Sequence, residues 1–498
     1  MKHTPAIRVL AALAALLMTA PLAACAGDNA GTTDTTASAV TTAAPTSNEQ
    51  AETQPPVDEN GFLLDNLPAD LSYGGATLTV LADEGQKKQY FAEDLTGDIV
   101  NDALYERERT VEERLGVNLE WNFIKGAWAN RDSFAQTVEQ SVQAGSQDYD
   151  LVVAYNLTPP VLAVKGVLEN LNDMKYIEVD QPWWPQTYVE QALYDDKLYC
   201  LAESSSRGVL RNMPAVFYNK ELTEQYGMND LLQVALDGDW TLDKLGELIK
   251  GTYRDLNGNN TVDAEDQFGL SVGAVAWLDA FFYGSGLTIT KVNEQGNPEL
   301  TLGDEKVQTY IDKILPFLNE SPDVYPLDAK QYQMFKSGRA VFYVSTIAIT
   351  DQLRDVDINY GVMPMPKFDA NQEAYHTTMS NTHDVWCIPI NGKNTEAAGA
   401  ALEALASGSY RQVYPAYYET ALKVKYAPDD QIAQVYDMIR AGVMFDFGYI
   451  YSNCFDRMPA LYVRDCVQKN DPNWSSVWAA QKDSMTLKLD EILKALAD

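Results

Sequence analysis

The sequence predicts an α/β protein of two lobes, and three observations support this fold class. The chain has 498 residues, which is too long for one ordinary hydrophobic core. Its composition, 46% hydrophobic with 28 Tyr, 15 Phe and 9 Trp, is typical of a globular protein rich in aromatic contact surface. From about residue 75, strand and helix patterns alternate, as they do when helices flank mainly parallel sheets.

The first elements follow one another as strand, helix, strand, helix, strand. Residues 76–82 place apolar side chains on one face, and residues 98–115 carry an apolar stripe at helical spacing. Residues 117–123 alternate strictly, residues 134–142 again have helical spacing, and residues 150–155 form an almost fully apolar run. This order implies a parallel sheet with right-handed crossovers.

Open parallel sheets bind ligands beyond the carboxyl ends of their strands. The residues delivered to that edge are Asp83 and Glu84 after the first strand, and Tyr155 and Asn156 after the third.

Later segments continue the alternation and complete a second α/β lobe. A helix is predicted at 241–254, with Thr241 as its N-cap, and further helices at 393–407 and 475–497. Short strands are predicted at 340–344 and 384–390.

The N-terminal segment indicates export. Residues 1–24 have a short basic start and an apolar run that ends in small residues, the layout of a signal peptide. The following Cys25 completes a lipobox-like sequence, so we expect it to be the lipidated, palmitate-bearing first residue of the mature protein; the alternative is a cleaved soluble signal with an incidental cysteine. Residues 25–70 are rich in Thr, Ala, Ser and Pro and are predicted to form a disordered tether. No later stretch approaches the roughly 20 apolar residues of a membrane span, so we expect membrane contact through lipid alone.

The charge and cysteine count restrict the partners and the redox state. The formal net charge of −34 argues against nucleic acid and anionic lipid head groups, which would be repelled. Four cysteines besides Cys25 permit two disulfides in an exported chain. Cys454 and Cys466 are close enough in sequence to pair locally, which would leave Cys200 and Cys387 for a long-range bridge. Free buried thiols are the open alternative.

Common catalytic signatures are absent from the sequence. It contains no GxxxxGK, GxGxxG, GxSxG or HExxH motif. His376 and His383 are the only histidines outside the signal and have no fitting partner nearby, so we interpret them as surface or core-rim residues. A carboxylate pair for glycoside hydrolysis depends on spatial separation and not on sequence spacing, so a glycan-active enzyme stays open as an alternative.

One loop has nearly the spacing of a twelve-residue calcium loop. Its oxygen-bearing positions are Asp255, Asn257, Asn259, Thr261 through its carbonyl, Asp263 and Asp266. The usual glycine at the sixth position is Asn260, which tolerates a left-handed backbone, and the last ligand is a short Asp. We expect a structural Ca²⁺ and no organic cofactor; an Asn/Gly-rich turn closed by side-chain hydrogen bonds is the alternative.

Eight segments between about 75 and 498 contain short motifs that follow one another in a set order. They include "AVFYNKEL", "GDWTLDKLGEL", "FKSGRAVFYVS" and "YGVMPMPKFD". The others are "DALYERERTVEERLGVNLEW", "YDLVVAYNLTPPVLAVKGVLENLNDM", "DQPWWPQTYVEQALYDDKLYCLAESSS" and "HDVWCIPINGKNTEAAGAALEAL". Each motif is weak alone, but in this order they resemble the extracellular solute-binding proteins of bacterial ABC importers, the group that includes maltose-binding protein and the Gram-positive sugar-binding lipoproteins.

The resemblance implies a two-lobe periplasmic-binding-protein-like fold of type II that closes like a hinge around its ligand. Lobe 1 would comprise 75–200 plus 358–395, and lobe 2 would comprise 205–355 plus 400–498. The protein would be a monomeric lipoprotein on the extracellular face of a bacterial cytoplasmic membrane. It would capture a small-molecule solute, foremost a sugar or oligosaccharide, and deliver it to ABC permease subunits. Peptides, polyols and other solutes, or glycan binding without transport, are alternatives.

The resemblance also places aromatic side chains near the ligand cleft, where flat rings can stack on the C–H faces of sugars. The candidates are Tyr155, Trp183, Trp184, Trp277 and Trp386, with Tyr283 and Tyr449 as lesser ones. Candidate hydrogen-bond partners for hydroxyl groups are Asp83, Asn156 and Asp446. For every aromatic residue the alternative is core packing. Arg207 and Arg211 could pair with an acidic ligand, although solvated surface arginines are the default.

Overall fold

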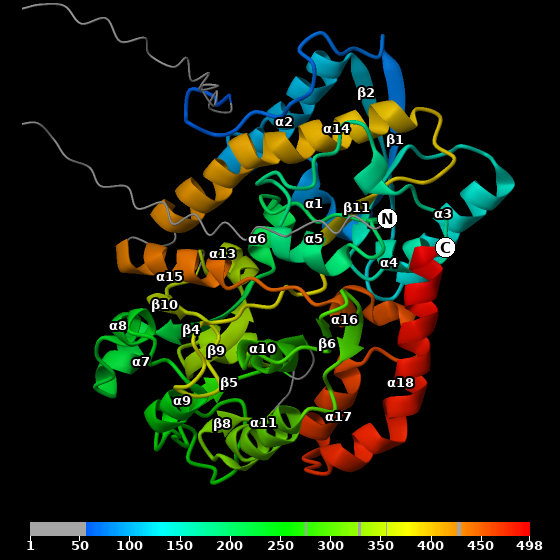
Figure 1. Cartoon of the computed structure of the whole chain (residues 1–498). Coiled ribbons are helices and arrows are strands. Elements are labelled where there is room, and N and C mark those ends of the chain that lie inside the picture. The colour runs from blue at the N-terminus through cyan, green and yellow to red at the C-terminus, as the bar shows by residue number, and fades with distance from the viewer. Residues whose placement is uncertain (1–55, 274–275, 327–329, 355, 426–429) are drawn as a thin grey trace, which may run out of the picture. The chain divides into compact units, whose positions relative to one another are not determined.

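The computed structural model describes residues 56–273, 276–326, 330–354, 356–425 and 430–498 (Figure 1). The predicted signal peptide and Cys25 lie outside the described residues. Part of the predicted tether lies within them and is ordered, which corrects the expected boundary at residue 70. Asp65 accepts hydrogen bonds from both terminal nitrogens of Arg114, at 2.8 and 2.7 Å, and from the Ser407 hydroxyl at 2.6 Å. These contacts and the buried Leu67 hold this segment on the core.

The first sheet has four strands in the order β11-β3-β1-β2. They are β1 (Ala76–Asp83), β2 (Val117–Ile124), β3 (Leu151–Tyr155) and β11 (Asp384–Cys387). β1 is parallel to β2 and β3, and β11 is antiparallel to β3. The predicted strand–helix order of the first lobe is therefore confirmed, with α2 (Ile99–Leu115) and α3 (Arg131–Ala144) as the crossover helices.

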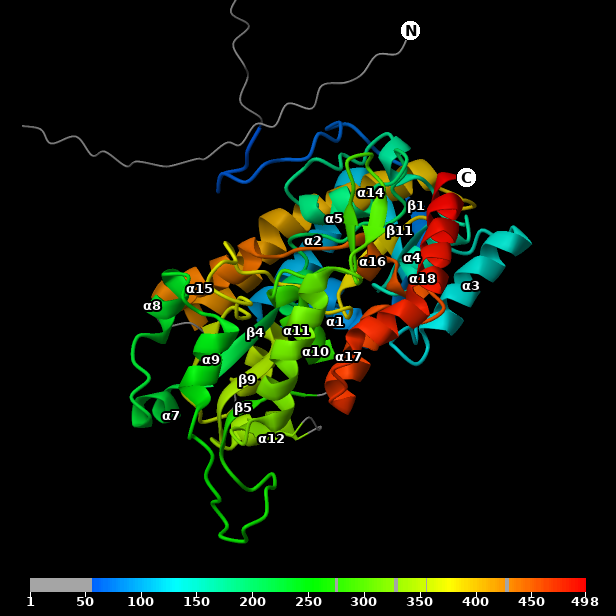
Figure 2. The same cartoon turned by 60° about the horizontal axis from the view of Figure 1, so that its bottom comes forward.

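Local sequence signals explain where α2 begins and ends. The Asp98 side chain accepts from the backbone N–H groups of Val100 and Asn101, which caps the helix. Gly116 ends it in the left-handed conformation at φ 56°. The buried face of α2 packs against α14 (Thr395–Gly408), and the two helices lie side by side in Figures 1 and 2.

The second sheet has five strands in the order β10-β4-β9-β5-β8. They are β4 (Pro214–Asn219), β5 (Phe268–Ser271), β8 (Val324–Tyr325), β9 (Ala340–Thr346) and β10 (Tyr360–Met363). β5 runs parallel to β8 and β9, whereas β4 is antiparallel to β9 and β10. This sheet is therefore mixed.

Two segments lie with the opposite sheet from the one that the sequence suggested. β10 falls in the range assigned to lobe 1 but pairs with β4, because its Tyr360 and Val362 come opposite Asn219 and Phe217. Most of α14 falls in the range assigned to lobe 2 but packs on α2. Short strands and alanine-rich helices have patterns that fit either sheet, so sequence alone could not place them.

The remaining elements flank the two sheets. The helices are α1 (Lys87–Tyr90), α4 (Pro159–Val164), α5 (Gln186–Ala192), α6 (Arg207–Arg211), α7 (Lys220–Gln225), α8 (Leu231–Leu236), α9 (Leu242–Ile249), α10 (Ala276–Gly284), α11 (Glu305–Leu315), α12 (Gln331–Lys336), α13 (Thr350–Leu353), α15 (Asp430–Ala441), α16 (Phe447–Ile450), α17 (Ala460–Lys469) and α18 (Trp474–Ala497). β6 (Thr290–Val292) and β7 (Pro298–Leu300) form a small hairpin. Thr241 caps α9 as predicted, through a 3.1 Å bond from the Lys244 N–H. In the described residues no helix is both long and apolar enough to cross a membrane.

Two segments connect the sheets and contact each other. Residues 203–213 lead from the first sheet into β4, and residues 377–383 lead back into β11. The Ser380 N–H donates to the Asn212 carbonyl at 3.0 Å, and Thr377 forms a bridge with Val443. The two crossing segments therefore contact each other through Asn212 and Ser380, where the chain passes from one sheet to the other.

The four described cysteines are free, so the disulfides that the sequence permits are not formed. Cys200, Cys387 and Cys466 are buried and Cys454 is partly buried. The Cys200 sulfur lies 3.4 Å from the Tyr188 hydroxyl, within hydrogen-bond range for sulfur. Burial raises the pKa of Cys200 to about 12, so this thiol stays protonated at neutral pH. The structure therefore agrees with the alternative of free, unpaired thiols.

Candidate functional site

A cavity of about 360 Å³ lies between the two sheets, with walls from both and a floor from the crossing segments. The first sheet contributes residues at the carboxyl ends of its parallel strands, and the second contributes the end of β9 and the start of α10. The lining residues are Trp128, Tyr155, Asn212, Trp277, Thr346, Ser380, Asn381, Thr382 and Arg464. None of these is Asp or Glu.

Three aromatic rings reach this cavity from different elements. Tyr155 ends β3, and Trp128 follows the parallel β2 four residues after its last residue, so both are delivered to the same sheet edge. Trp128 is 47% exposed, and the Arg131 guanidinium lies 4.4 Å from its ring centroid. Trp277 comes from the first turn of α10. It packs over Gly273, where an added Cβ would lie 2.5 Å from the indole ring.

The polar groups of the floor are fixed by hydrogen bonds to one another. The Tyr155 hydroxyl donates to Asn381 Oδ1 at 2.8 Å. Asn212 Nδ2 donates to the Gly208 carbonyl at 2.6 Å, and the Thr382 hydroxyl donates to Asn212 Oδ1. Burial raises the pKa of Tyr155 to about 12, so its hydroxyl is a neutral donor at physiological pH. The floor is therefore a preorganised set of uncharged groups.

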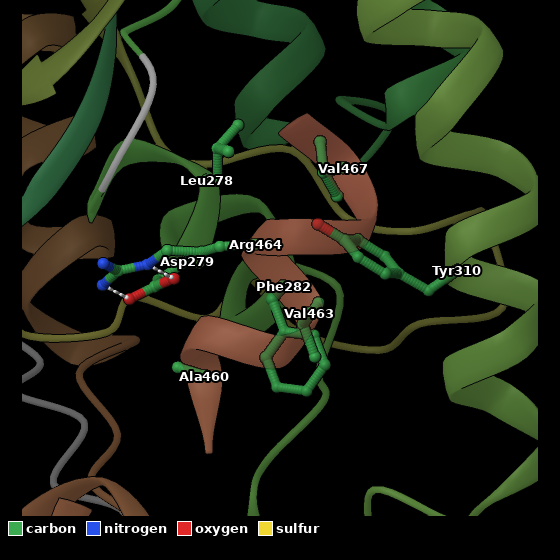
Figure 3. Close-up of a pocket in the computed structure, with 8 residues that line it drawn as sticks. All are labelled: Leu278, Asp279, Phe282, Tyr310, Ala460, Val463, Arg464 and Val467. Carbon is green, nitrogen blue, oxygen red and sulfur yellow. Dashed lines mark hydrogen bonds and ion pairs between the residues drawn. The ribbon is translucent and has the colours of Figure 1, made fainter. Parts of the chain in front are cut away.

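The one charged lining residue, Arg464, is neutralised by a carboxylate behind it (Figure 3). Its Nε donates to Asp279 Oδ1 at 2.6 Å, and its Nη2 donates to Asp279 Oδ2. Burial alone would lower the pKa of Arg464, but the Asp279 charge and hydrogen bonds raise it above its usual value. Figure 3 shows the third guanidinium nitrogen pointing away from Asp279.

The small pocket around this pair is not a second ligand site. It has a volume of about 10 Å³, which is room for at most about one water molecule. Apart from the ion pair its walls are the side chains of Leu278, Phe282, Tyr310, Ala460, Val463 and Val467. It lies where α10, α11 and α17 pack together, and this packing holds Arg464 in place.

The structure brings two of the sequence-predicted ligand residues, Tyr155 and Trp277, to one cavity. Asp83 and Asn156 lie at the same sheet edge but are fully buried and do not line it. Asp83 Oδ1 accepts from the N–H groups of Gly85 and Gly126 at 3.0 and 2.9 Å, which fixes the turn after β1. Trp386 on β11 is fully buried beside other aromatic rings.

Trp183 and Trp184 are core residues, which corrects their assignment to the ligand cleft. They are 0% and 1% exposed. Their indole N–H groups donate to the two carboxylate oxygens of Glu403 on α14, at 3.0 and 3.3 Å. The pair therefore attaches the segment before α5 to the helix layer of the first sheet.

Asp446, Tyr283 and Tyr449 are also structural, because all three are buried and Asp446 and Tyr283 have internal hydrogen-bond partners. Asp446 caps α16 and accepts from the backbone of Ile289 and Thr290 at 2.8 and 3.0 Å. The Tyr283 hydroxyl donates to Asp446 at 3.0 Å, and the ring of Tyr283 meets Tyr449 edge-on at 5.4 Å. All three side chains are buried, so a ligand would not reach them.

The remaining basic candidates have internal partners. Arg207 and Arg211 both pair with Asp351 on α13, so they are not simply solvated. His383 is fully buried, and burial lowers its pKa to about 4, so it is neutral at physiological pH. His376 is partly buried, and burial lowers its pKa as well.

Sequence reasoning missed Trp128 and Arg464. Trp128 carried a usable signal, because it follows the second parallel strand as Tyr155 ends the third. The sequence around Arg464 gives no such signal, because its side chain is held by Asp279, 185 residues away in the chain.

The loop at 255–266 is closed by its own hydrogen bonds and extends away from the second sheet (Figure 2). Asp255 accepts from the N–H groups of Gly258 and Asn260 at 2.7 and 2.9 Å, and Asn260 has the expected left-handed φ of 57°. Asp263 accepts from the side-chain amides of Asn257 and Asn259 at distances down to 2.8 Å. In the described residues no three acidic, His or Cys side chains come together as a metal site.

The donor set of this loop nevertheless fits a hard cation. It offers carboxylate and carboxamide oxygens, which are the ligands that calcium prefers. The two amide groups now present nitrogen to Asp263, and turning each amide over would present oxygen instead. The Leu256 N–H donates to Asp266 Oδ1 at 3.2 Å. Asp266, the last of the predicted ligand residues, therefore already contacts the start of the loop.

Comparison with known proteins places the fold. UgpB from Mycobacterium tuberculosis in complex with glycerophosphocholine is 15% identical, with a TM-score of 0.54 over 84% of this chain and 99% of that chain. Maltose-bound MalE3 of T. maritima is 14% identical, with a TM-score of 0.52 over 85% and 99%. The substrate-binding protein Lmo0181 from Listeria monocytogenes in complex with cycloalternan is 15% identical, with a TM-score of 0.50 over 85% and 99%. These likenesses confirm the predicted periplasmic-binding-protein-like fold.

A comparison with curated proteins gave no match. Residues 128–410, more than half of the chain, match the family model described as bacterial extracellular solute-binding protein. The matched range contains both sheets' crossing segments and all cavity residues except Arg464. The chain therefore belongs to the bacterial extracellular solute-binding proteins.

Proposed function

We propose that this protein captures an extracellular carbohydrate in the cavity between its two sheets and delivers it to the permease of an ABC importer. The carrying observation is the cavity itself, in which the rings of Trp128, Tyr155 and Trp277 surround a floor of neutral hydrogen-bonding groups. Aromatic faces suit the C–H faces of a sugar, and fixed uncharged donors and acceptors suit its hydroxyl groups. Similar folds that bind maltose and cycloalternan support the same class.

The cavity also favours binding over catalysis and a short ligand over a long one. Glycoside hydrolysis uses a pair of carboxyl groups beside the scissile bond, and no Asp or Glu lines the cavity. The volume of about 360 Å³ lies at the low end of the roughly 300–1,000 Å³ found for small-molecule pockets. We therefore expect a monosaccharide or a short oligosaccharide, bound without turnover.

Capture would follow the hinge mechanism that two sheets joined by crossing segments permit. Trp128 and Tyr155 would hold one side of the ligand and Trp277 the other, so the ligand would stabilise the closed arrangement. The export-signal pattern and Cys25 support lipid anchoring on the extracellular face of the membrane, and a monomeric state belongs to the same proposal. A structural calcium ion in the loop at 255–266 belongs to the same proposal.

A thermal-shift screen followed by calorimetry tests the function. The full mature chain is tested against monosaccharides, maltose, maltotriose and cyclic glucans, with glycerophosphocholine, a peptide pool and an amino-acid pool in parallel. We expect one class of sugar to raise the melting temperature of the protein. That sugar should be recovered chemically unchanged when the incubated mixture is analysed by chromatography. Stabilisation by the peptide or amino-acid pool alone would overturn the carbohydrate assignment, and release of a hydrolysis product would establish the enzyme alternative.

A further inference from the structure

We propose that Asp279 makes the cavity selective for uncharged ligands, by neutralising Arg464 from behind and fixing it as a hydrogen-bond donor. This inference rests on the proposed function, because it concerns the charge class of the ligand in the same cavity. Asp279 lies on α10 and Arg464 on α17, and only the arginine lines the ligand cavity.

The geometry divides the guanidinium into two parts. Nε and Nη2 donate to the two oxygens of Asp279, and Nη1 points away from that carboxylate (Figure 3). The side chains of Arg464 and Asp279 are 8% and 5% exposed, so the pair is desolvated and strongly coupled. A bidentate carboxylate also locks the plane of the guanidinium, which gives its free N–H groups a defined direction.

An uncharged ligand and an anion meet this arrangement differently. A hydroxyl or carbonyl oxygen can accept from Nη1 without disturbing the ion pair. A carboxylate, sulfate or phosphate would bring a second negative charge to the buried guanidinium of Arg464, whose positive charge is already balanced by Asp279. The chain's net charge of −34 adds a long-range field that also disfavours anions.

The other charged groups near the cavity do not reverse this balance. Arg131 lies against Trp128 at the cavity rim and pairs with Asp132 at 3.7 Å, so its charge is also partly compensated. Asp83 ends the strand that neighbours the strand of Tyr155, and burial raises its pKa, so any charge that it carries is negative. Without Asp279, Arg464 would be an unpaired buried cation and a ready site for an anion.

Titration calorimetry with sodium sulfate at constant ionic strength tests this role of Asp279 without knowledge of the natural sugar. We expect Asp279→Asn to bind sulfate at least about tenfold more tightly than the wild type, the effect of roughly one charge-assisted hydrogen bond. The double variant Asp279→Asn with Arg464→Met should lose that gain. Equal sulfate affinity in the wild type and Asp279→Asn, or a gain that survives in the double variant, would overturn the proposal.

A second measurement needs only the wild type, in case the buried substitution prevents folding. Each sugar that binds in the thermal-shift screen is compared with its uronate, and we expect the uronate to bind at least about tenfold more weakly. A uronate that binds as tightly as its neutral sugar would refute the selectivity. Absence of any sugar binding would instead count against the proposed function, while the sulfate titrations would still report on Asp279.

Discussion

Two pairs of tryptophans in this protein have different surroundings. Trp183 and Trp184 are buried, and each indole N–H reaches the same carboxylate, Glu403. Trp128 and Trp277 stand at the interlobe cavity, the first 47% exposed and the second partly buried. The comparison teaches that a tryptophan's role is decided by whether its polar edge and its faces already have partners inside the fold.

The largest expected effect is on stability, at the buried pair. Trp183→Ala removes a fully buried ring and one donor to Glu403, so we expect the free energy of unfolding to fall by about 3–5 kcal/mol. Urea denaturation measures this loss. Trp128→Ala is the matched control and should cost well under half as much, because its ring is half exposed. Equal losses in the two variants would break the comparison.

The next effect is on ligand affinity, at the cavity pair. Trp277→Ala removes a ring that faces the ligand, and we expect at least a roughly tenfold weaker Kd for the sugar found in the thermal-shift screen, with the melting temperature little changed. Calorimetry measures the affinity, and Trp277→Phe should restore part of it because a smaller flat ring remains. Unchanged affinity in Trp277→Ala would remove this residue from the proposed site.

The sequence could predict local features and the edge of the sheet that carries the site. The alternation at 117–123 fixed which side chains of β2 face the core, and Tyr155 was placed at the cavity because parallel strands deliver their carboxyl ends to one edge. Partnerships across the fold were not predictable. Trp183 is a core residue whose indole donates to Glu403, 220 residues away in the sequence. The residues around Trp183 and around Glu403 give no sign of this pairing.

The Glu403 carboxyl group that contacts the two buried tryptophans makes the stability of this region depend on pH. Burial raises the pKa of Glu403 from 4.5 to about 8, although the indole and backbone N–H groups oppose the rise. The folded state therefore holds a proton that the unfolded state releases between pH 4.5 and 8. This contribution to stability is fully present below pH 4.5 and is lost as the pH rises to 8.

We expect Glu403→Gln to flatten the decline of the melting temperature between pH 6 and 8, because glutamine does not titrate. Asp384→Asn is the matched control, since burial raises the pKa of Asp384 to about 7 and its contribution is exhausted near that pH. Denaturation at pH 5, 6, 7, 8 and 9 separates the two variants. A Glu403→Gln profile parallel to the wild type between pH 7 and 8 would contradict the proton on Glu403.

The smallest expected effect concerns the loop at 255–266. A change there should alter stability, as a change at the buried tryptophans does, and should not alter ligand affinity. The loop is held by hydrogen bonds of Asp255 and Asp263 and is distinct from the cavity lining, so a bound calcium ion would stabilise the loop alone. We expect a chelator to lower the melting temperature by a few degrees and to leave the sugar Kd unchanged. In Asp263→Asn the chelator should have no further effect, because that variant lacks a ligand oxygen with charge. Loss of sugar binding by the folded, chelated protein would show that the loop acts on the site, and a melting temperature indifferent to both chelator and calcium would show that its hydrogen bonds alone close it.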